Sequence, residues 1–240
     1  AQGFRQDIVR YKYQGRWSTR PSGPLMRRLS GSPSFERITD TSGRLVSRLG
    51  SLSTQLELES NDVVRFRVSR NYELLDTDFP IDEDVTIPIG EYSWTDGQIS
   101  LRAASRRAVS GNLTFTLGEF YDGTITSLRY QRGRVTLSDQ FSVEPSVSYN
   151  DVKLRAGDFT TTLVGLRADF AFTPLMFVGG LMQYDTDSDS FSSNLRFRWE
   201  YGPGSEFFAV YTDERTTLGG GFPGLQNRAF VLKINRLLRF

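Results

Sequence analysis

The stretch NLRFRWEY, which runs from Asn194 to Tyr201, alternates strictly between polar and apolar side chains. Every second residue from Leu195 onward is apolar, and the residues between them are charged or polar. Successive side chains of a β-strand point to opposite sides, so a period of two is typical of a strand with one apolar and one polar face. The stretch therefore predicts a β-strand, and the same pattern recurs along most of the chain.

This alternation predicts about thirteen strands and no convincing helix. The strands are expected at residues 8–19, 25–38, 44–59, 63–73, 91–104, 111–121, 124–132, 140–150, 160–172, 175–184, 191–201, 206–212 and 228–240. Many would exceed the roughly 5–6 residues that are usual in soluble strands. A tilted strand of about 9–11 residues crosses a bilayer, so the lengths favour an all-β, antiparallel transmembrane β-barrel.

Composition agrees with a β-rich chain and excludes several classes of function. The chain has 240 residues, among them 18 phenylalanines, 10 tyrosines and 22 glycines. It contains no cysteine and no histidine, which excludes disulfides, iron–sulfur clusters, zinc sites built from these residues, and thiol or imidazole catalysis. With 29 basic and 28 acidic residues the net charge is +1, so nothing favours nucleic acid as a partner. No apolar run reaches the length of about 18 residues that a transmembrane helix needs.

The connections between the predicted strands alternate in length. The turns Ser60–Asp62 and Gly202–Gly204 are short, whereas segments 74–90 and 213–227 are long. Outer-membrane barrels have short periplasmic turns and longer external loops. We therefore expect the two short turns to face the periplasm and the two long segments to face outside. The alternation is imperfect, because two further connections on the expected outer side are short: 39–43 and 121–124.

In such a barrel the apolar face of each strand contacts lipid and the polar face lines a wet lumen. The residues expected to face lipid are Leu52, Leu56, Phe66, Val143, Val147, Leu195 and Phe197. The residues expected to face the lumen are Arg65, Arg67, Glu144, Arg196 and Arg198. Pairs of opposite charge across strands would plug the lumen, whereas spare arginines would favour anions, and both possibilities stay open.

The last predicted strand ends on an aromatic residue, Phe240, and Phe230, Leu232 and Ile234 share its face, which Arg236 interrupts. A terminal aromatic residue on an alternating last strand is a feature in which bacterial outer-membrane barrels resemble one another. The resemblance implies that the C-terminal strand contacts the barrel-assembly machinery.

Several stretches resemble the C-terminal barrel of a bacterial outer-membrane family of unknown function. They are residues 194–201, 203–205, 208–211, 70–75, 88–92, 118–123, 158–161 and 227–228. The resemblance spans essentially the whole chain, 1–240, and implies the bacterial outer membrane as the location, with the lipid bilayer and lipopolysaccharide as partners. In that family a domain similar to family-9 carbohydrate-binding modules precedes the barrel, and no such domain is recognisable in this chain.

The strand count bears on whether the barrel is complete. Complete single-chain bacterial barrels have an even number of strands, so a count of about thirteen favours the C-terminal part of a longer barrel, with a missing N-terminal domain. The alternative is a complete barrel with one strand overlooked, whose mature end is Ala1-Gln2-Gly3.

One acidic motif has the spacing of a calcium loop. Asp185, Asp187 and Asp189 alternate as the first ligands of such a loop do. The glycine and glutamate that the loop needs further on are replaced by Ser190 and Arg196. An ordinary hydrated turn is therefore the favoured interpretation, and the three aspartates are weak metal candidates.

Two other acidic groups have the side chains that metal binding or hydrolysis requires. Asp82 and Asp84, in the acidic segment 74–90, would suit Ca²⁺ or Mg²⁺ held between lipopolysaccharide molecules. Glu119 and Asp122 are paired carboxylates, the kind of group that hydrolyses glycosides, but they bracket a Tyr-Asp-Gly turn. A hydrated loop and a turn are the favoured interpretations. No catalytic residue, cofactor or metal is assigned.

The sequence thus predicts an outer-membrane β-barrel that is not an enzyme and serves as an anchor or pore. The carbohydrate-handling surface or periplasmic module that it would serve is implied by the resemblance alone. Two alternatives stay open: an outer-membrane hydrolase with carboxylates on its loops, and a soluble β-barrel that binds a ligand.

Overall fold

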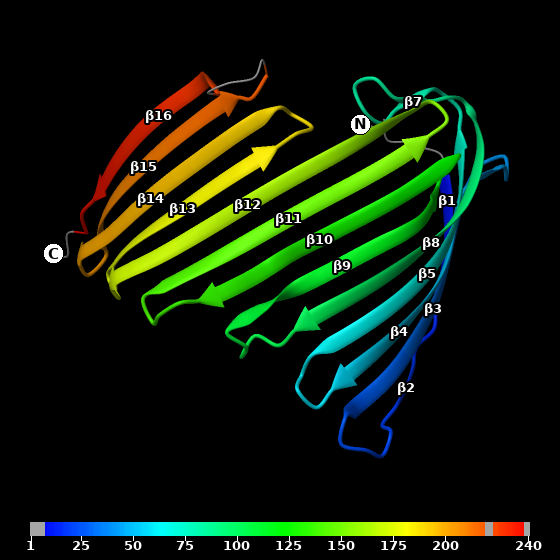
Figure 1. Cartoon of the computed structure of the whole chain (residues 1–240), viewed down its shortest axis with the longest axis horizontal. Helices are drawn as coiled ribbons and strands as arrows, with labels where there is room; N and C mark the ends of the chain where they lie inside the picture. The colour runs from blue at the N-terminus through cyan, green and yellow to red at the C-terminus, as the bar shows by residue number, and fades with distance from the viewer. Residues whose placement is uncertain (1–7, 219–222, 238–240) are drawn as a thin grey trace. The chain divides into compact units, whose positions relative to one another are not determined.

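A computed structural model describes residues 8–218 and 223–237, which form an all-β fold (Figure 1). One antiparallel sheet of 14 strands contains every strand except β6 and β7, which pair with each other. Strands follow one another across the sheet in sequence order, so the predicted all-β antiparallel fold is confirmed. In the described ranges, no helix is long and apolar enough to span a membrane.

The chain divides into two units, which are described separately. The first unit comprises residues 1–104, 113–128 and 150–160. It contains eight complete strands: β1 (Ile8–Gln14), β2 (Trp17–Thr19), β3 (Met26–Asp40), β4 (Leu45–Leu58), β5 (Val63–Leu75), β6 (Phe79–Pro80), β7 (Thr86–Ile87) and β8 (Gly90–Ala103).

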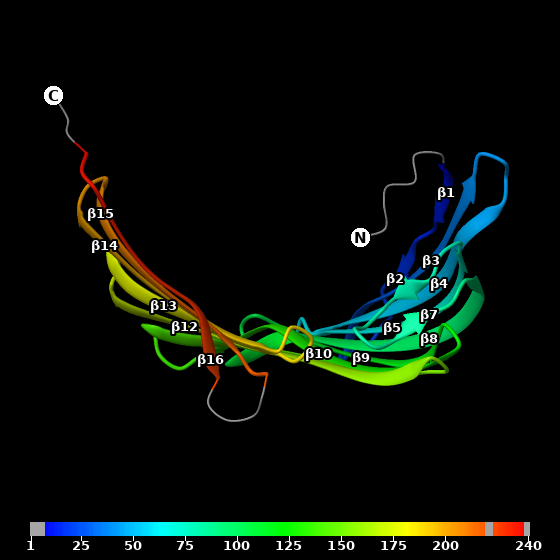
Figure 2. The ribbon, with the colours of Figure 1, turned by 90° about the horizontal axis from the view of Figure 1, so that it is seen from above.

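The second unit comprises residues 105–112, 129–149 and 161–240. Four strands contribute residues to both units: β9 (Val109–Phe120), β10 (Gly123–Thr136), β11 (Phe141–Leu154) and β12 (Gly157–Thr173). The last four strands belong to the second unit alone: β13 (Met176–Asp185), β14 (Ser190–Gly202), β15 (Ser205–Thr216) and β16 (Gly224–Asn235). These four run side by side (Figure 2).

The first predicted strand, 8–19, is wrong as a continuous element. The structure divides it at Gly15 into β1 and β2, both of which pair with β3. Pro33 of β3 lies at the break, and its carbonyl accepts a hydrogen bond from the Gly15 amide at 3.0 Å. A proline has no amide hydrogen to return, so the ladder cannot continue regularly past it.

Segment 74–90 is not one long hydrated loop, because it contains two short strands. β5 extends to Leu75, and the following residues form the hairpin β6–β7 before β8 begins at Gly90. The Ile81 amide donates to the Val85 carbonyl at 3.0 Å and closes the hairpin. The second long segment, 213–227, is also shorter than predicted, since β15 continues to Thr216 and β16 begins at Gly224. Phe240 and Ala1–Gly3 lie outside the described residues.

Few apolar side chains are buried. Among the described residues the buried hydrophobic side chains are Val63, Leu75, Val85, Ile87, Ala104, Val152 and Leu154. In the described part of the chain the sheet is open, because β1 pairs only with β3 and β16 only with β15. The expected closed barrel is therefore not seen, although the antiparallel meander is the topology from which such barrels are made.

Candidate functional site

The first unit carries an exposed apolar face on β4, β5 and β8. The register places Leu52 opposite Val68, and Phe66 opposite Ile99, so the members of each pair share a face. Leu52 is 55% exposed, Val68 58% and Phe66 46%. Leu56, opposite Val64 two residues from Phe66, continues the same face. The predicted grouping of Leu52, Leu56 and Phe66 on one face is thus what the structure shows.

The second unit carries a similar face on β13 to β16. Leu195 lies opposite Gly180 and Tyr211, and two residues on, Phe197 lies on the same face. The face continues to β16, where Leu232 is 56% exposed and Ile234 is 69% exposed. On β11, Val143 and Val147 alternate with serines, one of which, Ser146, donates to the carbonyl of Gly165 at 3.4 Å.

The opposite faces of both units carry charged and polar side chains, and in the second unit Phe177 and Phe208 share that face with Arg198. On β5, Arg65 and Arg67 alternate with the apolar residues, and Arg65 donates to the side-chain oxygen of Gln55 at 2.6 Å. On β14, Arg198 forms an ion pair with Glu206 of β15. The Arg198 guanidinium also lies 5.7 and 5.8 Å from the ring centroids of Phe177 and Phe208.

The remaining predicted polar residues gather in the second unit. Arg196 lines a shallow hollow together with Arg167, Asp169 and Gly179. Arg167 pairs with Asp169 at 2.8 Å, and Glu144 is close enough to act electrostatically on the same guanidinium. The polar face of this unit therefore contains acidic side chains that pair with arginine.

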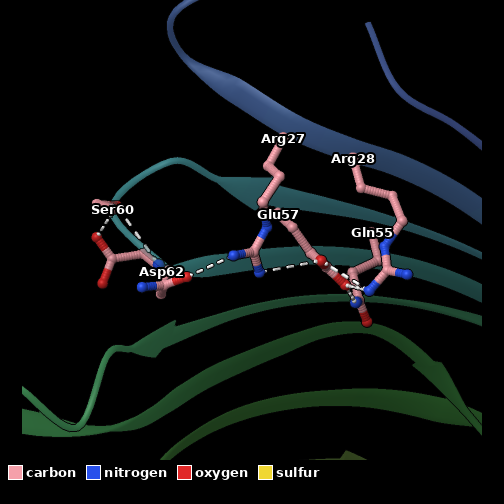
Figure 3. Close-up of polar contacts among 7 residues, drawn as sticks. Arg27, Arg28, Gln55, Glu57, Ser60 and Asp62 are labelled. Carbon is pink, nitrogen blue, oxygen red and sulfur yellow. Dashed lines mark hydrogen bonds and ion pairs between the residues drawn. The ribbon is translucent and has the colours of Figure 1, made fainter.

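The buried carboxylate of Glu57, near the end of β4, binds arginines of β3. Arg28 donates to both oxygens of Glu57 at 2.6 and 2.8 Å, and Arg27 approaches the same carboxylate at 3.5 Å (Figure 3). Gln55 donates to Glu57 at 3.0 Å, and Arg27 also donates to Asn61 at 2.7 Å. Glu57 meets its arginine partners through the register of β3 and β4, which places Arg28 opposite Glu57.

The turn between β4 and β5 is closed by its own side chains. Asn61 has a left-handed φ of 66°, which asparagine tolerates better than most residues. Ser60 donates to the Asp62 carboxylate at 2.6 Å, and the other oxygen of Asp62 accepts from the Ala104 amide at 2.9 Å. This end of the first unit is therefore compact, as expected for a short turn.

At the other end of β5, the hairpin β6–β7 docks on the polar face. Leu75 lies on the same face as Arg65 and Arg67, because all three occupy alternate positions of β5. Leu75 is 4% exposed, and Val85 and Ile87 of the hairpin are 3% and 1% exposed. These three residues form one cluster with Val152 and Leu154, and further side chains pack around it: Phe79, Ile81, Tyr92, Phe120, Tyr121, Ile125 and Phe159. Figure 1 shows β7 at the end of the sheet where β11 turns into β12.

Tyr121 lies beside this cluster, in the turn between β9 and β10. It has a left-handed φ of 49°. Its ring centroid is 4.6 Å from Trp94 in a stacked arrangement and 5.3 Å from Tyr92. The hydroxyl donates to the Glu73 carboxylate at 2.8 Å. Burial, together with this hydrogen bond, raises the pKa of the Tyr121 phenol above its usual range.

The paired carboxylates Glu119 and Asp122 have separate structural partners. Glu119 accepts a hydrogen bond from the Thr95 amide at 2.9 Å. Asp122 accepts one from the Arg155 amide at 3.4 Å. Each carboxylate thus binds the backbone of a different neighbouring strand or turn, which is an ordinary structural role.

The candidate metal ligands lie in two turns. Asp185 ends β13 and accepts a hydrogen bond from the Asp187 amide at 3.0 Å, while Asp189 has a left-handed φ of 43°. Asp82 exchanges backbone hydrogen bonds with Val85 at 3.3 Å in the β6–β7 turn, which also contains Asp84. Within residues 8–218 and 223–237, no group of three or more acidic side chains is placed to hold a metal ion.

In comparisons with known proteins, no family model matches the chain, and neither a curated protein nor a solved structure is significantly similar to it.

Proposed function

We propose that this chain is the wall of a bacterial outer-membrane β-barrel, which acts as an anchor or pore for a carbohydrate-handling surface or periplasmic module. The proposal rests on one observation, which is that the sheet has an exposed apolar face and an opposite polar face. Long antiparallel strands present an exposed apolar face on one side and arginines, glutamates and serines on the other. Lipid outside and water inside would satisfy both faces.

The exposed apolar face is difficult to reconcile with a soluble protein. Monomeric soluble proteins rarely expose a continuous apolar patch of more than a few hundred Å². Side chains such as Leu52, Leu195 and Ile234 are at least half exposed, while the buried cluster consists of only five residues in the described part of the chain. In a bilayer, contact with acyl chains would remove this surface from water at roughly 25 cal/mol per Å².

The backbone also suits a membrane wall. Strand β12 has 17 residues and β5 has 13, which exceeds the roughly 9–11 residues needed to cross a bilayer. Backbone groups within the hydrocarbon core must be paired, and among the described strands of the main sheet only β1, β2 and β16 have a neighbour on one side alone. A complete barrel would therefore pair these open edges, either with each other or with further strands.

The carbohydrate-handling module enters the proposal through the family resemblance of stretches such as 194–201. The hydrolase alternative has less support, because Glu119 and Asp122 each bind a backbone amide of a different segment. The soluble-barrel alternative would require the apolar face to be covered.

Membrane integration tests the proposal directly. The protein, expressed with an export signal in a Gram-negative host, should sediment with the outer membrane and resist extraction by carbonate or urea. It should need detergent to stay monodisperse, and its mobility on gels should change on heating, as for folded barrels. A protein that is monomeric and soluble without detergent would overturn the proposal.

A further inference from the structure

At one end of the first unit, the residues on the polar face change from polar to apolar. Along β5, Arg65 and Arg67 are followed on the same face by Glu73 and then by Leu75. The change at Leu75 coincides with the place where the hairpin packs.

β11 shows the same change at its end. Asn150, whose side chain bonds Ser127, is followed on its face by the buried residues Val152 and Leu154. Apolar residues thus replace polar ones on this face where the hairpin covers it. The hairpin removes these apolar side chains from the water that would fill a lumen on this face.

The hairpin covers that patch and is fixed at both of its ends. Val85 lies so close to Gly157 that a Cβ on the glycine would meet it at 3.1 Å. Tyr92 donates to the Pro88 carbonyl at 2.8 Å, and the Ile89 amide donates to Asp78 at 3.1 Å. Ile87 is 1% exposed, whereas Ile89, two residues later, is 63% exposed. The segment is therefore docked through specific residues on one side.

We propose that the β6–β7 hairpin is an inward-folded constriction of the pore and that its acidic tip makes the pore favour cations. This inference rests on the proposed outer-membrane barrel. The hairpin occupies the polar face, so it narrows whatever space that face encloses. It remains docked because its apolar residues are matched by an apolar patch.

The charge of the hairpin determines the direction of the selectivity. The tip contains Asp82, Glu83 and Asp84, and the chain has no basic residue between Arg70 and Arg102. Glu83 and Asp84 are exposed, and neither forms an ion pair with any residue that the structure describes. Fixed charges at the narrowest part of a pore act on ions within about one Debye length, which is about 8–10 Å at physiological salt. Carboxylates there attract cations and repel anions.

Single-channel recording of the full-length protein in planar bilayers tests the constriction. Ile87→Asp places a charge in the buried anchor and should undock the hairpin, which raises the conductance by about twofold or more, as expected when a constriction opens. Ile89→Asn places an uncharged polar group at the exposed isoleucine two residues away and should leave the conductance at the wild-type value. Equal conductance of the wild type and both variants would show that the hairpin does not constrict the pore. The proposed barrel would not be affected by that result.

The selectivity is tested in a KCl gradient with variants that leave the anchor intact. The triple variant Asp82→Asn, Glu83→Gln, Asp84→Asn should shift the reversal potential toward that of a less cation-selective pore. An unchanged reversal potential would overturn the role of the tip.

Cysteine labelling supplies a readout that needs no current. In this cysteine-free chain, Ile87→Cys should react with a soluble maleimide at least about tenfold more slowly than Ile89→Cys, because local opening must precede its reaction. Equal rates would show that the hairpin is not docked and would overturn the inference. If the wild type and all variants insert into the bilayer but conduct no ions, the protein is not a pore and has no constriction. The role of membrane anchor would then remain. Failure of the wild type to insert would overturn the proposed function itself.

Discussion

Tyr121 illustrates how one residue can join several elements. Its left-handed backbone forms the turn between β9 and β10, its ring stacks on Trp94 of β8, and its hydroxyl donates to Glu73 of β5. The turn-forming sequence Tyr-Asp-Gly explains the backbone alone. The ring and the hydroxyl add contacts to residues that lie far away along the chain.

The ionisation of Tyr121 should occur at unusually high pH. The folded protein holds the phenol neutral to a higher pH than the unfolded chain, so this contribution to stability is present at neutral pH and is lost as the pH rises above about 10. In an alkaline absorbance titration, the difference between the wild type and Tyr121→Phe should show a midpoint above that of ordinary tyrosines. Tyr121→Phe should also cost about 1 kcal/mol at neutral pH, the value of a partly screened hydrogen bond. A difference titration centred at the ordinary value would contradict the buried position.

The buried carboxylate of Glu57 should matter more than an exposed one. The Glu57 side chain is 8% exposed, against 23% for Glu36, which pairs with Arg10 at 2.8 Å. Glu57→Gln removes the charge that two arginines share, so it should lower the urea midpoint of unfolding in detergent more than Glu36→Gln does. Equal midpoints for the two variants would show that the Arg27–Arg28–Glu57 contacts contribute little.

At the scale of an element, β14 shows how alternation determines which way a side chain faces. Leu195 and Phe197 lie on the apolar face, while Arg196 and Arg198 occupy the positions between them. The neighbouring strand β13 contains Leu181, which lies opposite Asn194 and thus on the polar face.

These two strands offer a matched pair of leucines for testing the lipid-facing side. Leu195 is 50% exposed and Leu181 is 39% exposed, but they point to opposite faces. In a folded barrel in bilayers, Leu195→Arg should cost roughly 2–4 kcal/mol near the midplane, whereas Leu181→Arg should cost at most about 1 kcal/mol. Reversible unfolding in lipid vesicles measures both values. Similar costs for the two substitutions would mean that Leu195 does not face lipid.

At the scale of the whole molecule, the meander assigns turns to opposite ends. β5 joins the turn at Ser60–Asp62 to the β6–β7 hairpin, so these two segments lie at its two ends. Its 13 residues span about 40 Å at roughly 3.3 Å per residue. That length is sufficient to cross a hydrocarbon core of about 30 Å even when the strand is tilted.

The predicted orientation places the hairpin outside and the short turn in the periplasm. An impermeant maleimide applied to intact cells should label Glu83→Cys but not Ser60→Cys, and permeabilised cells should label both. The wild type, which has no cysteine, is the background control. Labelling of Ser60→Cys alone on intact cells would reverse the topology and with it the assignment of inside and outside.

Local pattern was sufficient to predict most of the strands, although not the break at Gly15 or the β6–β7 hairpin. A strand positions each side chain by its own backbone, so the alternation in 194–201 placed Leu195 and Arg196 on opposite faces without knowledge of any partner. The inventory of side chains, which lacks cysteine and histidine, likewise follows from the sequence alone.

The tertiary structure decided everything that depends on residues distant in sequence. The first strand breaks because Pro33 lies beside Gly15, and Glu57 is buried because two arginines of β3 reach it. The β6–β7 hairpin packs on the sheet, where Val85 meets Gly157. None of these contacts leaves a periodic signal in the sequence, because each joins segments whose approach is determined by strand pairing rather than by neighbours along the chain.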